Sequence, residues 1–214
     1  GEDATYDRAI QIYGAYLDKD MEADGTRYLE AALSGTAKNA QDHCDRGRVY
    51  YYMDDYDNAA DELKQAIDGN NTEALALLGM VYMEQGDSEN ARTMFQQYVS
   101  QADNGAKGFN GLALCDIEAG DYDSALSNIS SGIHVAEGEE LQSLLFNEIA
   151  VYEKKLEFQT ALQKAKEYLD LYPEDKTVKK ELAFLNTRVS STDSASAESA
   201  DTTSDSGVAE ATDD

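Results

Sequence analysis

His43 and Cys44 place a base and a nucleophile side by side, the two residue types that nucleophilic catalysis combines. Consecutive residues of a helix point about 100° apart, so this pair cannot form the hydrogen bond that would activate the thiol. His43 also stands at a position that we expect to be buried between helices. The pair therefore indicates packing, and we expect the chain not to be an enzyme.

Metal and phosphate chemistry have equally weak support in the sequence. Two histidines and two cysteines lack the short spacings of a zinc site. Asp54, Asp55 and Asp57 resemble the start of a calcium loop, but no glycine follows in frame and the acidic residue that should end the loop is missing. The segment 105–108 lacks both the glycine spacing of a phosphate-binding loop and a preceding strand. We expect no metal and no cofactor.

The elements that position these residues repeat along the chain. Small residues recur at intervals of 34, 32, 34 and 36 positions: Gly25, Ala59, Ala91, Ala125 and Ala161. Mostly apolar residues follow four positions later: Leu29, Leu63, Phe95, Ile129 and Ala165. Nine positions before the small residues stand Tyr16, Tyr50, Tyr82, Asp116 and Tyr152. These spacings predict one helix face packed against a preceding helix, and a period near 34 indicates stacked helix–turn–helix units.

We predict an all-α fold in which the repeats stack into a right-handed α–α superhelix spanning residues 1–188. Its five repeats are expected at 6–36, 40–70, 72–103, 106–137 and 142–172, followed by a capping helix at 174–188. From residue 189 the composition changes to Ser, Thr, Ala and Asp, which predicts an acidic, disordered tail over 189–214.

These features resemble the tetratricopeptide repeat (TPR) family. The segments 47–50 and 79–82 match the family's glycine-to-tyrosine step, the recurring alanines match its small position, and Pro173 matches its closing proline. The resemblance covers about residues 6–188 and departs from the family where Asp116 replaces tyrosine. It implies a concave groove, lined by the first helix of each repeat, that binds a protein or peptide.

The residues expected at this groove come from four repeats: Arg48, Tyr51, Tyr52, Met80, Met83, Lys107, Asn110, Leu114, Ile117 and Phe146. They form no basic clamp, which argues against capture of acidic chaperone tails. An apolar stripe within them consists of Tyr51, Met80, Met83, Leu114, Ile117 and Phe146. The stripe is either a recognition surface or ordinary packing between successive first helices. Tyr51 and Tyr52 are the strongest candidates for contact with a partner, since adjacent helical residues cannot both face the same neighbour.

The charge of the chain limits its partners. It carries 43 acidic against 17 basic residues, a net charge of −26, which repels phosphate backbones and anionic lipids. Nucleic acid is therefore excluded as an expected partner. No apolar run approaches the roughly 18–20 residues that span a bilayer, so no transmembrane segment is expected. A protein or peptide is the expected partner.

Two further questions stay open in the sequence. Because the chain begins at Gly1, an export signal or lipid anchor could precede it, and a bacterial cell-envelope lipoprotein with a structural or assembly role is the alternative function. Its location would then be extracytoplasmic, with the cytoplasm as the alternative. The acidic tail is either a solvated linker or a ligand for the groove of its own or a neighbouring molecule, which would produce a homo-oligomer through the tail or the groove.

Overall fold

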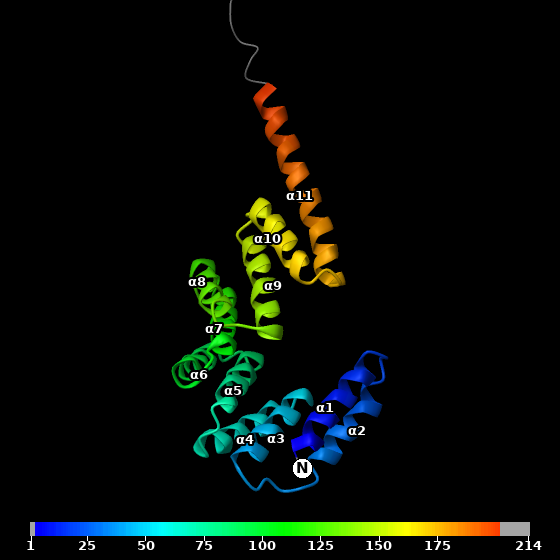
Figure 1. The fold of residues 1–214 in the computed structure, drawn as a ribbon, viewed down its shortest axis with the longest axis vertical. Helices are drawn as coiled ribbons and strands as arrows, with labels where there is room; N and C mark the ends of the chain where they lie inside the picture. The colour runs from blue at the N-terminus through cyan, green and yellow to red at the C-terminus, as the bar shows by residue number, and fades with distance from the viewer. Residues whose placement is uncertain (1–2, 202–214) are drawn as a thin grey trace, which may run out of the picture. The chain divides into compact units, whose positions relative to one another are not determined.

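A computed structural model of the chain describes residues 3–201 and consists of α-helices with no strand in this range (Figure 1). The chain divides into two compact units, the first ending at Leu141 and the second beginning at Gln142. The predicted all-α fold is confirmed for the residues that the structure describes. The predicted tail from residue 202 onward lies outside them.

The first unit is a series of helix pairs, each a first helix followed by a second helix. The pairs are α1 (Asp3–Leu17) with α2 (Glu22–Ala32), α3 (Ala40–Tyr52) with α4 (Tyr56–Asp68), α5 (Glu73–Glu84) with α6 (Ser88–Gln101), and α7 (Ala106–Ala119) with α8 (Tyr122–Ile133). Helices of a pair pack on each other, and the first helices α1, α3, α5 and α7 also contact one another in chain order (Figure 1). One side of each first helix is therefore shared with the next repeat.

An aspartate begins the second helix of three successive pairs. The side chains of Asp55, Asp87 and Asp121 each accept a hydrogen bond from the backbone N–H three residues later, at 3.3, 3.2 and 3.1 Å. These bonds satisfy backbone donors that the first turn of a helix leaves without a partner. Gly86 and Gly120 stand directly before two of the caps with φ of +74°, which lets the chain reverse between the paired helices.

Phe95 is the central side chain where α5, α6 and α7 meet. It is 2% exposed and lies against two glycines, Gly79 on α5 and Gly111 on α7. A Cβ atom added at Gly79 would stand 2.6 Å from the ring, and one added at Gly111 would overlap it more severely. The two helices can approach Phe95 this closely only because both positions lack a side chain.

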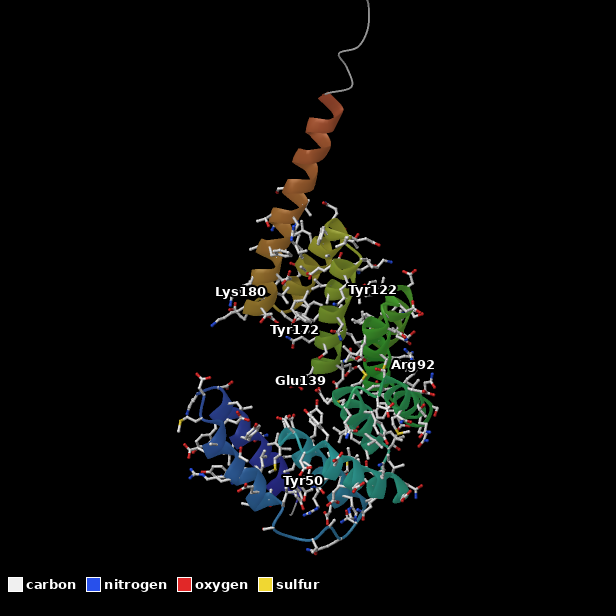
Figure 2. The ribbon with its side chains drawn as sticks, turned by 180° about the vertical axis from the view of Figure 1, so that it is seen from behind. Tyr50, Arg92, Tyr122, Glu139, Tyr172 and Lys180 are labelled. Atoms are coloured by element: carbon white, nitrogen blue, oxygen red, sulfur yellow. The ribbon has the colours of Figure 1, made fainter. Side chains whose placement is uncertain are left out.

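An ion pair and a hydrogen bond to one buried carboxylate link α6, α7 and α8. Arg92, labelled on α6 in Figure 2, donates from Nη2 to Oδ1 of Asp116 on α7 at 2.7 Å. Asn128 on α8 donates to the other carboxylate oxygen, also at 2.7 Å. Asp116 is 3% exposed, so the polar residue at the expected tyrosine position is held by partners from the two neighbouring helices.

The second unit contains most of α9 (Gly138–Lys154), which begins in the first unit, together with α10 (Phe158–Leu171) and α11 (Lys176–Asp201). Its core joins Ile149, Leu162, Val178 and Leu185 from these three helices. The expected capping helix at 174–188 corresponds to α11, which packs on α10 but continues to Asp201, past the predicted end. No glycine or proline interrupts residues 189–201, so the Ala- and Ser-containing segment continues the helical conformation.

The turn between α9 and α10 holds a leucine where the third and fourth repeats use Gly86 and Gly120. Leu156 has φ of +61° and is 72% exposed. A left-handed conformation costs a residue with a Cβ atom about 1–2 kcal/mol, and glycine avoids that cost. We expect Leu156→Gly to raise the free energy of unfolding by about 1 kcal/mol, measured by urea denaturation. Leu156→Ala keeps the Cβ atom and is expected to give no gain; an equal gain from both variants would contradict the explanation by backbone strain.

Candidate functional site

The side chains of His43 and Cys44 have different surroundings in the structure. His43 Nδ1 lies 2.6 Å from Oε2 of Glu62 on α4, and the other oxygen of Glu62 accepts a hydrogen bond from Arg46 Nε at 2.8 Å. Arg46 also donates to two backbone carbonyls in the segment after α2. Cys44 is 2% exposed, and burial raises the pKa of its thiol to about 12. The thiol is therefore protonated at neutral pH and buried, while His43 belongs to a network that joins α3 to α4.

The acidic residues of the calcium-like segment serve local structure. Asp55 caps α4, Asp54 accepts a hydrogen bond from the Tyr56 hydroxyl at 2.8 Å, and Asp57 accepts one from Gln85 at 3.1 Å. Among residues 3–201, no group of three or more His, Cys, Asp and Glu side chains is arranged to hold a metal ion. Within the same range, no helix combines the length and the apolar character needed to cross a membrane.

The predicted groove residues of the first unit lie on α3, α5 and α7. The repeat intervals of 32 and 34 positions place equivalent residues of the three helices in rows, and residues at i, i+3 and i+4 share one face of each helix. We call the resulting set the first-helix surface: Arg48, Tyr51 and Tyr52 of α3, Met80, Met83 and Glu84 of α5, and Leu114, Ile117 and Glu118 of α7.

The apolar members of the first-helix surface differ in exposure. Tyr52, Met80 and Leu114 are 41%, 40% and 37% exposed, one on each helix. Met83 is half-buried, and its sulfur lies 3.3 Å from that of Cys115. Within the apolar stripe, Met83 therefore packs between first helices, whereas Met80 and Leu114 are exposed, as is Tyr52 beside the stripe.

Tyrosines gather where α3 ends. The ring of Tyr51 makes a T-shaped contact with Tyr52 at a centroid distance of 5.9 Å and a tilted contact with Tyr56 of α4 at 6.0 Å. The Tyr51 hydroxyl donates to Glu84 Oε1 on the next first helix at 3.4 Å. Burial, together with the negative charge of Glu84, raises the pKa of Tyr51 to about 12.

The two predicted cations of the groove are engaged within the first unit. Arg48 pairs with Asp45 at 2.9 Å and with Asp7 of α1. Lys107 pairs with Glu73 of α5 and lies 3.9 Å from a carboxylate oxygen of Glu140. These contacts neutralise both side chains, so neither presents an uncompensated positive charge.

The remaining predicted residues have different surroundings. Asn110 is half-buried on α7. Phe146 is 39% exposed and belongs to the second unit, so it is described apart from the first-helix surface. Beside Lys107, Tyr98, Asn104, Glu137 and Glu140 line a pocket of about 210 Å³, which is below the roughly 300 Å³ at which ligand pockets usually begin.

Neither Glu84 nor Glu118 is among the candidate groove residues predicted from the sequence. The signal was present, because Glu84 and Glu118 stand 32 and 66 positions after Tyr52, on the same repeat register. Both carboxylates are on exposed residues. Glu84 accepts the Tyr51 hydroxyl and Glu118 accepts the Ser88 hydroxyl at 2.6 Å.

Comparison with protein families shows a match to a tetratricopeptide repeat model over residues 44–107 and again over 77–129. The sequence has no significant match among curated proteins.

Solved structures show the same fold at low identity. TTC0263, a thermophilic TPR protein from Thermus thermophilus, is 14% identical with a TM-score of 0.71, covering 87% of this chain and all of that one. YrrB, described as a TPR protein with an unusual peptide-binding site, is 19% identical with a TM-score of 0.55, covering 81% of this chain and 89% of that one. A chain of the APC/C hetero-tetramer Cut9–Hcn1 is 15% identical with a TM-score of 0.64. The match covers 82% of this chain but only 35% of that one.

Proposed function

Because this chain belongs to the tetratricopeptide repeat family, we propose that it is a non-enzymatic scaffold that binds a protein or peptide on its first-helix surface. The observation that carries the proposal is the placement of Tyr52, Met80 and Leu114. These large apolar side chains are exposed on three successive first helices. Exposed apolar residues in a contiguous series commonly mark sites of protein interaction. The peptide-binding site attributed to YrrB is consistent with this use of the fold.

The mechanism rests on preorganisation. The first helices are held by their second helices and by one another, so the binding surface exists before a partner arrives. The partner then bears most of the loss of conformational freedom on binding. Met80 adds adaptability, since an unbranched thioether side chain can repack around different partner residues. Tyr52 offers a rigid aromatic contact, the residue type enriched at the centres of interfaces.

The alternative function in the cell envelope has no comparable support. The family match and the solved structures concern the repeat fold and carry no information about the cell envelope. The binding proposal is therefore the one that we carry forward.

A selection of phage-displayed random peptides against the whole chain tests the proposal. We expect enriched peptides whose affinity falls about 100-fold or more in the variant Tyr52→Ser/Met80→Ser/Leu114→Ser, because each lost apolar anchor costs about 1–2 kcal/mol. Fluorescence anisotropy measures the affinity, and circular dichroism checks that helicity is retained.

The matched control replaces three exposed apolar residues outside the first helices: Met21→Ser, Val135→Ser and Leu171→Ser. We expect this control to bind as the wild type does. A selection that enriches no peptide, or peptides that bind both triple variants equally, would overturn the proposal.

A further inference from the structure

The edge at which α3, α5 and α7 end is acidic. Glu84 is the last residue of α5, Glu118 is the penultimate residue of α7, and both take the register of Tyr52 at the end of α3. Asp54 follows α3 closely and accepts the Tyr56 hydroxyl. Carboxylates therefore line this edge beside the exposed apolar side chains of the first-helix surface.

Nothing in the described part of this edge balances its charge. No lysine or arginine occupies the last turn of α3, α5 or α7, where a basic residue would offset the partial negative charge of a helix C-terminus. Among residues 3–201, no basic side chain forms an ion pair with Glu84 or Glu118. Arg48 and Lys107 belong to the same helices α3 and α7, but each is already paired with two carboxylates.

The tyrosine cluster adds a second means of attracting positive charge. Aromatic rings hold a cation over their faces, most strongly for arginine and lysine side chains. Tyr51, Tyr52 and Tyr56 meet at centroid distances of 5.9 and 6.0 Å beside Glu84 and Asp54. The hydrogen bond from the Tyr56 hydroxyl to Asp54 raises the pKa of Tyr56 to about 12, which agrees with a negative electrostatic potential where α3 ends.

We propose, building on the proposed function, that the partner is a basic segment that places lysine or arginine side chains against Glu84, Glu118 and the tyrosine cluster while its apolar side chains contact the first-helix surface. Charge complementarity is the argument for this occupant. Such a contact covers the exposed apolar side chains and neutralises the carboxylates that have no basic partner.

The same argument disfavours two other occupants. The C-terminal residues 190–214 contain seven acidic residues and no basic one, so this tail would meet carboxylates of like charge. A second copy of the chain brings a net charge of −26 to the same edge. Self-association through the groove is therefore the less favoured arrangement.

The experiment runs the peptide selection in parallel against the wild type and Glu84→Gln/Glu118→Gln. We expect the wild type to enrich peptides rich in lysine and arginine, and the variant to lose that bias. A representative basic peptide is expected to bind the variant about tenfold more weakly, and its wild-type affinity is expected to fall with rising salt. The same peptide with glutamine at its basic positions is expected to bind both proteins equally.

Glu30→Gln/Asp68→Asn is the charge-matched control, since it removes two exposed carboxylates from second helices. We expect this control to bind the basic peptide as the wild type does. Enriched peptides without a basic bias, or an equal loss of affinity in the control, would overturn the inference and leave the binding function standing. Enrichment of acidic peptides would overturn it too, whereas failure to enrich any peptide counts against the proposed function itself.

Discussion

Alanine in place of Gly111 is expected to destabilise the protein by about 1–3 kcal/mol, the usual cost of inserting atoms into a packed core. In an exposed helix the same substitution would stabilise by about 1 kcal/mol, because glycine is the poorer helix former. The sign reverses here because the new methyl group would overlap the ring of Phe95. A Cβ atom at Gly79 on α5 would meet the same ring atoms, Cδ1 and Cε1, so both helices already pack closely against this edge of the ring.

Urea denaturation of four proteins tests this explanation: the wild type, Gly111→Ala, Phe95→Ala and the double variant. Phe95→Ala alone is expected to cost about 3–5 kcal/mol. In that background Gly111→Ala should become neutral or stabilising, because the obstructing ring is gone. Gly14→Ala is the control, since Gly14 lies in α1 with nothing within 4 Å of an added Cβ atom. A destabilising Gly111→Ala in both backgrounds would show that a contact other than Phe95 is responsible.

The contact between Gly111 and Phe95 is a feature of the fold that the sequence does not predict. The repeat helices are predictable because apolar and small residues recur at one interval in several copies, so each copy supports the others. Gly111 belongs to no such series; the equivalent positions in the two preceding repeats hold Asp45 and Leu77. Its close approach to Phe95 depends on how α7 packs on α6, which a single sequence does not express. The extension of α11 past Arg188 was missed for a related reason, because polar composition alone does not end a helix.

The sequence predicts which candidate residues occupy equivalent positions in successive repeats. It does not predict which of these side chains are exposed or which of their charges are neutralised. Met80 and Met83 are both at groove positions by spacing, yet only Met80 is exposed, because Cys115 of the next first helix packs against Met83. The ion pairs that neutralise Arg48 were not predictable from the sequence either, since one partner, Asp7, is 41 residues away along the chain. Contacts between successive repeats decide these outcomes, and the repeat period predicts only which positions meet.

Arg92→Met is expected to destabilise the protein by about 3 kcal/mol, because it leaves the buried carboxylate of Asp116 without its ion-pair partner. Asn128 would still donate one hydrogen bond, but a neutral amide does not offset the charge. Asp116→Asn should cost less. It removes the buried charge itself, and the side chain of Arg92, 37% exposed, can turn to water.

The double variant Arg92→Met/Asp116→Leu is expected to recover most of the loss, since apolar residues of similar volume often replace a buried ion pair without cost. Urea unfolding of the wild type, Arg92→Met, Asp116→Leu and the double variant measures the coupling between the side chains. Arg27→Met is the control. Its side chain is 58% exposed, so we expect a change below about 0.5 kcal/mol. A loss in Arg92→Met no larger than in this control would contradict the buried-charge explanation.

The same double variant separates stability from function. Asp116 lies on α7 between Leu114 and Glu118, two residues of the first-helix surface, so the ion pair holds the helix that presents them. If the pair contributes only stability, the double variant should bind the selected peptides as the wild type does. A stably folded double variant that binds them more weakly would show that the pair sets the orientation of α7. The polar residue at this tyrosine position would then serve the binding surface as well as the core.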